Sequence, residues 1–301
     1  MESAGRAEPR RESPGLNLRE TLADADRRRI AIGHFNVSEL ATLRGVVSAA
    51  GELRAPVLVG VSEGERGFIG VREIAAVIRA LRAERPTPIF LNADHTHSLA
   101  GAEAAARAAF DQIIFDGSAL SFEENVQQTR RAVEAIRSID PTIVVEGEIG
   151  YIGSGSEILA EAPKGMGALS TPSEAREFVE ATGVDVLAPA VGNMHGLLTS
   201  MVRGEAQKRL DVQRIKAIKE EARVPMTLHG GSGTNDGDLR QAIKAGITIV
   251  HINTELRLAW RRGVEAYLVA HPDEVTPYKI LSDAVEAVRQ VVTTRMRLFS
   301  S

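Results

Sequence analysis

The chain has no cysteine among its 301 residues, and this absence removes several classes of protein and of site. Without thiols there can be no disulfide framework, no thiolate nucleophile, and no cysteine-ligated zinc or iron–sulfur centre. Any metal site in this sequence must therefore be built from histidine and carboxylate side chains.

Long hydrophobic runs and concentrated positive charge are also missing. No stretch approaches 18 consecutive apolar residues, and a net charge of -4 comes without any basic cluster interleaved with aromatics. We therefore expect neither a membrane nor a nucleic acid as a partner. Residues 1–17 are polar and arginine-rich and lack the apolar segment of a signal peptide. We expect a cytoplasmic protein with a disordered leader over 1–17 and one domain over 18–301.

Eight short apolar, β-branched runs alternate along the chain with longer helical patterns, which is typical of βαβ units. The predicted strands are 30–37, 56–62, 88–94, 112–117, 142–149, 184–192, 224–231 and 247–254. The predicted helices are 39–53, 71–83, 100–109, 213–222 and 239–245, with capping boxes at Ser121–Glu124 and Thr171–Glu174 starting two more. Eight such units without a linker predict a single α/β domain, a (β/α)8 TIM barrel with C-terminal helices. A doubly wound open sheet is the alternative.

Polar side chains end these strands, and in a (β/α)8 barrel the carboxyl ends of the strands form the active face. His95, His195 and His229 each follow a different predicted strand. Three imidazoles without thiolates suit Zn²⁺ or a similar divalent metal with one position left for substrate. His97 could be the ligand in place of His95, or a partner of it. Glu146 and Glu148 share one strand face and could serve the metal, move protons, or pair with arginine.

A glycine-rich segment, His229-Gly-Gly-Ser-Gly-Thr234, ends the seventh predicted strand, and Asn253-Thr254 ends the eighth. Small residues let backbone N–H groups face a ligand, and barrels often hold a phosphate at the loops after these two strands. The sequence therefore predicts an anion site beside the predicted metal site.

The sequence resembles the class II, metal-dependent fructose-bisphosphate aldolases and their tagatose-bisphosphate relatives. The resemblance runs from about residue 18 to the C-terminal RMRLF, and it rests on the segments NADHTHS, FDGSALSFEEN, VEGEIG, GVDVLAPAVGNMHG, RVPMTLHGGSG and HINTEL. It implies that His95, His195 and His229 bind a catalytic Zn²⁺. It also implies that Asp116 and Glu148 contact the metal in a second position.

The resemblance further implies that Asp94 is the catalytic acid/base and that Glu157 handles the proton at C3 of the sugar. The residues that match substrate contacts are Asn36, Ser62, Gly196, Gly230, Gly231, Ser232, Asn253 and Thr254. A monovalent cation and a homodimer or homotetramer are also properties of that family. The implied reaction is reversible cleavage of fructose 1,6-bisphosphate, a phosphorylated ketose of glycolysis and gluconeogenesis, to dihydroxyacetone phosphate and glyceraldehyde 3-phosphate.

Several residues depart from the family pattern near the expected substrate: Thr96 and His97 follow the Asp-His pair, and His251 and Glu255 replace Asn and Asp. Tagatose 1,6-bisphosphate or another ketose bisphosphate is therefore the alternative substrate. A metal-dependent hydrolase and a non-catalytic sugar-phosphate binding protein are the alternatives of a different class. Schiff-base chemistry is disfavoured, because none of the six lysines ends a predicted strand.

Overall fold

The computed structural model describes residues 17–153, 155–162 and 168–301. Its sheet is a closed barrel of eight parallel strands in the order β1-β10-β9-β7-β5-β4-β3-β2. Pairing of Ile32 with Ile249 closes the barrel, so the predicted (β/α)8 fold is confirmed and the open-sheet alternative is wrong. The barrel strands are β1 (Ile32–Asn36), β2 (Val57–Val61), β3 (Ile89–Thr96), β4 (Gln112–Phe115), β5 (Val144–Ile149), β7 (Val186–Pro189), β9 (Met226–Leu228) and β10 (Ile247–Ile252).

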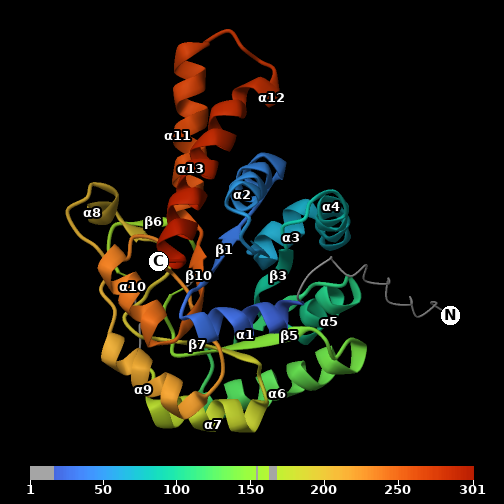
Figure 1. Cartoon of the computed structure of the whole chain (residues 1–301), viewed down its shortest axis with the longest axis vertical. Coiled ribbons are helices and arrows are strands. Elements are labelled where there is room, and N and C mark those ends of the chain that lie inside the picture. Colours follow the sequence, from blue (N-terminus) through green and yellow to red (C-terminus); the bar gives the residue numbers. More distant parts are fainter. Residues whose placement is uncertain (1–16, 154, 163–167) are drawn as a thin grey trace, which may run out of the picture.

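Helices surround this barrel (Figure 1). Those predicted from the sequence are present as α2 (Leu40–Leu53), α4 (Val71–Glu84), α5 (Leu99–Arg107), α9 (Val212–Ala222) and α10 (Asp236–Ala245). The two predicted capping boxes are confirmed at the starts of α6 (Phe122–Ile139) and α7 (Pro172–Thr182). Within the described ranges, no helix is both long and apolar enough to cross a bilayer.

The amino end of the barrel is closed by α1 (Leu18–Arg28), which the sequence pattern did not reveal. Asn17 caps this helix, while the rest of the predicted leader, 1–16, lies outside the described residues. Leu18, Leu22 and Ala25 face a ring of inward-pointing apolar residues, one from each of six strands: Ile32, Leu58, Phe90, Val144, Val186 and Ile249. Burial of this layer away from water stabilises the barrel floor.

The carboxyl end of the barrel is built from loops and short elements. After β5 and β7 the chain forms a small parallel pair, β6 (Ile158–Leu159) with β8 (Leu197–Leu198), followed by α8 (Thr199–Val202). A short helix, α3 (Glu63–Ile69), follows β2. Beyond β10 the chain forms α11 (Thr254–Ala270), α12 (Pro277–Ile280) and α13 (Ser282–Phe299), and α11 and α13 project beside α2 (Figure 1).

Several strands end earlier than predicted, and β7 shows the reason. The apolar run 184–192 predicts a long strand, but pairing stops at Pro189, and Gly192 has a φ of 103° that only glycine adopts readily. The apolar residues after Pro189 line the turn that leads to His195.

Candidate active site

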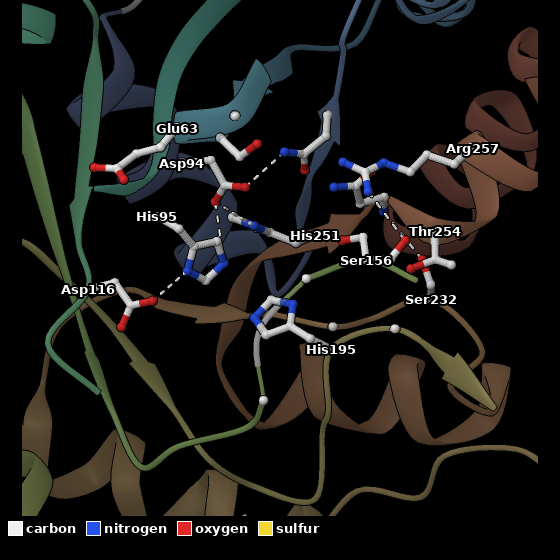
Figure 2. Close-up of a pocket in the computed structure, with 18 of the residues that line it drawn as sticks. Glu63, Asp94, His95, Asp116, Ser156, His195, Ser232, His251, Thr254 and Arg257 are labelled. Carbon is white, nitrogen blue, oxygen red and sulfur yellow. Dashed lines mark hydrogen bonds and ion pairs between the residues drawn. The ribbon is translucent and has the colours of Figure 1, made fainter. Parts of the chain in front are cut away.

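A pocket opens at the carboxyl end of the barrel, and most of the residues predicted to bind substrate line it (Figure 2). These are Asn36, Ser62, Gly196, Gly230, Ser232, Asn253 and Thr254. Gly231 lies behind the pocket, where its N–H donates to the carbonyl of His251. Asp94, His95, Asp116 and His195 share the pocket wall, so the predicted catalytic and binding residues converge on one space.

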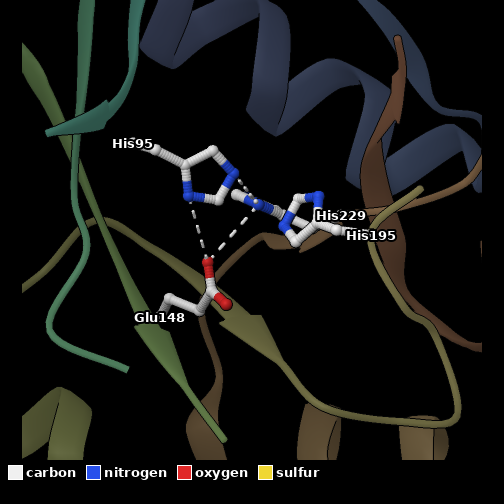
Figure 3. A group of neighbouring side chains, drawn as sticks. All are labelled: His95, Glu148, His195 and His229. Atoms are coloured by element: carbon white, nitrogen blue, oxygen red, sulfur yellow. Dashed lines mark hydrogen bonds and ion pairs between the residues drawn. The ribbon is translucent and has the colours of Figure 1, made fainter. Parts of the chain in front are cut away.

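Four potential metal ligands lie together, two of them in the pocket wall: His95, Glu148, His195 and His229 (Figure 3). Each offers a ligand atom, and these atoms all lie within 4.8 Å of one another. His229 Nδ1 is 3.2 Å from His95 Nε2 and 3.4 Å from Glu148 Oε2. His195 Nε2 and Glu148 Oε2 are buried without a hydrogen-bond partner. Buried polar atoms that lack partners but face one point fit a divalent cation with nitrogen and oxygen ligands.

The backbone of β3 turns His95 into this cluster. His95 has a φ of 43°, in the left-handed region that residues other than glycine rarely adopt. The pairing of β3 with β4 is irregular between Ala93 and Thr96, which is where the extra rotation enters. Asp94 and His95 can therefore both face the pocket although they are adjacent in the strand.

Carboxylates behind the cluster orient two of its imidazoles. Glu146 Oε1 is 2.7 Å from His229 Nε2, and Gln112 and Thr227 donate to the other oxygen of Glu146. Asp116 Oδ2 is 2.8 Å from His95 Nδ1. A carboxylate on one ring nitrogen fixes the tautomer and turns the other nitrogen toward a metal. Glu146 thus pairs with histidine, and the alternative of an arginine partner is wrong.

The charges in the cluster shift its pKa values strongly. Burial and the charge of Asp116 raise the pKa of Glu148 to about 8. Burial acts to lower the pKa of His95, but Asp94, Asp116 and Glu148 outweigh it and raise that pKa to about 10. Excess negative charge in a buried site favours any bound cation, whether proton or metal ion. The negative charge of the cluster therefore favours the protonated forms of His95 and Glu148 and suits a metal cation in their place.

Asp94 lies beside the cluster and is held from the opposite side. Its Oδ2 accepts a hydrogen bond of 2.8 Å from Asn36, while its buried Oδ1 has no hydrogen-bond partner and lies 3.8 Å from His95 Nε2. Burial acts to raise its pKa, but the charge of His95 is the largest of the effects that outweigh burial and lower that pKa below the usual range for a carboxyl group. Asp94 is therefore an ionised carboxylate with one oxygen free to take a proton.

Comparison with known proteins agrees with this arrangement. The family model described as fructose-bisphosphate aldolase class-II matches residues 16–301. A probable fructose-bisphosphate aldolase of Bacillus subtilis (strain 168) is 33% identical over 292 residues, covering 96% of this chain and 98% of that protein. The chain belongs to the class II fructose-bisphosphate aldolase family. It is an enzyme, a lyase, and its family acts on phosphorylated sugars.

Solved structures of aldolases share this fold. The YdjI aldolase of Escherichia coli K12 superimposes with a TM-score of 0.79 at 29% identity, covering 94% of this chain and 97% of that one. A putative fructose-1,6-biphosphate aldolase of Coccidioides immitis gives a TM-score of 0.79 at 27% identity, covering 94% and 96%. The class II aldolase family is metal-dependent, and the four-residue cluster is the place where this chain can hold its metal.

Two residues singled out from the sequence lie away from the centre of this aldolase site. Glu157 has an exposed side chain that does not line the pocket, and its backbone carbonyl accepts from Leu197. His97 lies at the pocket rim with 57% of its side chain exposed and is not part of the cluster. The structure therefore places His95, rather than His97, in the cluster of potential metal ligands.

Sequence reasoning missed Arg257, which lines the pocket from the first turn of α11. It lies three residues after Thr254, so both side chains share one helix face, and Arg257 Nη2 is 2.8 Å from Glu65 Oε1. The i to i+3 spacing from a predicted binding residue is the signal that could have identified this arginine.

His34 and His251 form a stack that continues from the aldolase cluster into the barrel. The rings of His34 and His251 lie 3.5 Å apart and nearly parallel, and His251 stacks on His229 at 4.2 Å. A Cβ at Gly60 would lie 2.0 Å from the His34 ring, so glycine on β2 makes room for it. Burial lowers the pKa of His34 to about 4, although Asp94 acts against that shift. His34 is therefore a neutral core residue.

Proposed function

We propose that this protein catalyses the reversible, Zn²⁺-dependent cleavage of fructose 1,6-bisphosphate to dihydroxyacetone phosphate and glyceraldehyde 3-phosphate. The observation that carries the proposal is the convergence of His95, His195, His229 and Glu148 on one point with the ionised Asp94 beside it. The relatives named as fructose-bisphosphate aldolases support this substrate.

The first step is proton removal from the C4 hydroxyl of the open-chain ketose. Asp94 accepts this proton through its unpartnered Oδ1, and Asn36 holds the other oxygen so that the carboxylate cannot turn away. The C3–C4 bond then breaks, C4 becomes the aldehyde carbon, and the bonding electrons move toward C3 and the C2 carbonyl. A metal ion held by His95, His195, His229 and Glu148 would supply a Lewis acid for this carbonyl and for the negative charge.

Return of a proton to C3 completes the cleavage, and by the resemblance this role falls to Glu157. Its exposed position outside the pocket lining means that its loop would have to bring the side chain inward. The role of Glu157 therefore stays a prediction, and Asp94 carries the proposed chemistry.

One side of the pocket offers several groups that suit a phosphate. Gly196, Gly230, Ser232 and Thr254 form a small-residue wall beside His195, where backbone N–H groups and hydroxyls can meet one phosphate. Arg257 lies on the same side of the pocket, next to Thr254 and Ser232 (Figure 2), and can add a guanidinium to this phosphate site. These groups support a phosphorylated substrate.

We further propose a cytoplasmic homodimer or homotetramer that binds a second metal position through Asp116 and Glu148. In the present geometry Asp116 is engaged by His95 and Ser118, so it would have to exchange the His95 contact for the metal. Tagatose 1,6-bisphosphate, which differs at C4, remains the alternative substrate because His251 lies 3.6 Å from Asp94 Oδ1, next to the group that would meet the C4 hydroxyl.

The deciding experiment is triose phosphate release from fructose 1,6-bisphosphate before EDTA, after EDTA, and after zinc is restored. We expect cleavage that EDTA abolishes and zinc restores. Cleavage of tagatose 1,6-bisphosphate alone would reassign the substrate, and cleavage that survives complete metal removal would refute the proposed chemistry.

A further inference from the structure

A lysine lies buried directly behind the wall that carries two of the proposed metal ligands. Lys208, in the loop between α8 and α9, is 3% exposed and does not line the pocket. Its Nζ donates to three backbone carbonyls, those of Met194 and Gly196 at 2.7 Å each and that of Gly230 at 2.9 Å. We call these three carbonyl oxygens and the space between them the carbonyl cage.

The cage joins two segments that are far apart in the chain. Met194 and Gly196 flank His195, and Gly230 directly follows His229. The backbone of Lys208 is itself fixed, because its N–H donates to Gly233 and its carbonyl accepts from Asn235. One side chain therefore ties the loop after β7 to the loop after β9, and both loops carry a proposed metal ligand and the small-residue phosphate wall.

The geometry requires a positive charge in the cage. Burial lowers the pKa of Lys208 to about 7, with Glu255 acting in the opposite direction. Three acceptor carbonyls need three N–H donors, however, which the ammonium group has and a neutral amine lacks. With the side chain removed, three carbonyl dipoles would point their negative ends at one another across an empty space. Carbonyl oxygens converging in this way are the ligands that hard monovalent cations take.

Glycine backbone conformations give the cage its shape. Gly196 and Gly230 have φ values of 74° and 60°, in the left-handed region. A Cβ at Gly230 would lie 2.2 Å from the carbonyl oxygen of Met194, so a larger residue would displace one cage member. The two glycines therefore shape both the carbonyl cage and the pocket on the other side of the small-residue wall.

We propose that Lys208 is a tethered cation: its ammonium occupies a site that would otherwise be filled by a free monovalent ion, so this aldolase needs no K⁺, Na⁺ or NH₄⁺. Lys208 is a positioning residue that holds His195, His229 and the phosphate wall in place, and its role in catalysis rests on the proposed function. The monovalent cation implied by the family resemblance is thus supplied here by the chain.

The test removes the tether and asks whether a free ion replaces it. Lys208→Ala leaves the cage open, whereas Lys208→Met fills the space with an uncharged chain of similar length. Lys216→Met, on the exposed face of α9, is the matched control. Each full-length, zinc-loaded protein is measured in potassium, ammonium, sodium and tetramethylammonium chloride at one ionic strength, for thermal unfolding midpoint and for cleavage of fructose 1,6-bisphosphate.

We expect the wild type and Lys216→Met to be indifferent to the cation in both measurements. In tetramethylammonium, Lys208→Ala should lose roughly 10- to 100-fold in kcat/KM, because three charge-assisted hydrogen bonds are gone. Potassium or ammonium should restore most of this loss and raise the unfolding midpoint of Lys208→Ala, and neither ion should rescue Lys208→Met. A lysine that acted only by packing would give no cation-specific rescue.

Several results would overturn the proposal. These are a wild-type enzyme activated several-fold by potassium, a Lys208→Ala protein as active as the wild type in tetramethylammonium, and equal rescue of both variants by every salt. If neither variant folds, the cation dependence of the wild type still decides. If the wild type cleaves no ketose bisphosphate, the proposed function fails, while cation-specific shifts in the unfolding midpoint of Lys208→Ala still test the tether.

Discussion

The two ends of the barrel interior are made from the same strands but have opposite chemistry. At the amino end, Ile32, Phe90 and Val144 pack under α1 in an apolar layer. Two residues further along the same strands, His34, Asn92 and Glu146 are buried, and after two more come Asn36, Asp94 and Glu148. Side chains alternate between the two faces of a strand, so residues that are two apart all point into the barrel. They differ only in their position along the barrel axis.

This difference shows that two layers of one core have separate roles. The lower, apolar layer stabilises the fold, and the upper, polar layer carries the proposed chemistry. The apolar layer gains free energy from burial, while each buried polar group above it costs free energy unless a partner compensates. Glu146 is compensated by three hydrogen bonds, whereas His195 Nε2 and Glu148 Oε2 are left without any. These two atoms belong to the cluster in which we propose that a metal ion binds. Changes at the upper level should therefore affect metal and activity, and changes at the lower level should affect folding.

The largest effect is expected from removing a ligand at the upper level. His229→Ala should lose bound zinc and reduce cleavage to background, because it removes both a ligand and the partner of Glu146. Metal analysis by mass spectrometry together with the cleavage assay checks this. His97→Ala, at the exposed rim, is the control that should retain its zinc. An active, zinc-free His229→Ala protein would refute the ligand assignment.

Removing the proposed base should separate metal binding from chemistry. Asp94→Ala should keep stoichiometric zinc and lose roughly 1,000-fold in kcat, within the range for a positioned acid/base group. Asp94→Asn, which can still accept from Asn36 but cannot take up the proton, should lose nearly as much. If Asp94→Asn kept a tenth or more of wild-type kcat, another group would have to be the base.

A cavity at the lower level should cost stability and leave the site intact. Phe90→Ala should lower the free energy of unfolding by about 3–5 kcal/mol, because Phe90 is 6% exposed under α1. Chemical denaturation measures this change. The folded variant should bind zinc as the wild type does, and a lower zinc affinity without loss of stability would show that the two levels are not independent.

Weakening the orientation of a ligand should have a smaller effect than removing it. Glu146→Gln keeps the size of the side chain but loses the charge that faces His229 Nε2. Zinc affinity should fall about 10- to 100-fold, the usual cost of losing a carboxylate behind a metal-bound imidazole. Competition with a zinc indicator measures this change. An unchanged affinity would mean that the charge of Glu146 does not set the orientation of His229.

Zinc affinity should also change with pH. Without metal, the pKa of Glu148 is raised to about 8 and that of His95 to about 10, so both groups hold protons at neutral pH that zinc must displace. Raising the pH removes this competition, and zinc affinity should increase about tenfold per pH unit for each displaced proton between roughly pH 6 and pH 8. A flat profile over that range would show that the metal-free cluster is already deprotonated.

The eight strands and most of the site could be predicted from the sequence because both depend on local patterns. Short β-branched runs mark buried parallel strands, and a polar residue just after such a run must lie at the active face. That reasoning identifies Asp94, His95, His195 and His229 from the order of residues alone. It could not rank Glu146 and Glu148, because alternation gives the direction of a side chain but not the neighbours at its level.

The parts that escaped prediction depend on long-range packing. Helix α1 has an ordinary amphipathic sequence, and only the closed barrel shows what it covers. Lys208 lies in a loop with no periodic pattern, and the carbonyls that bind it come from segments fixed by tertiary structure. Glu157 was assigned by the resemblance on a match in a glycine-rich loop, which does not show where the side chain points, and it is exposed.

Barrel closure also sets an order of events in the cell. β1 pairs with β2, which follows it closely in the chain, and with β10, the last strand of the barrel. Helix α1 packs on side chains from both β1 and β10, so it needs both ends of the sheet in place. Most of the strands are therefore synthesised before β1 can pair with β10. During that interval the apolar layer that contains Phe90 is not covered by α1. Such distant pairing slows folding and exposes the nascent chain to aggregation. Chaperone demand during synthesis should consequently depend on the β1–β10 seam more than on any residue of the catalytic pocket.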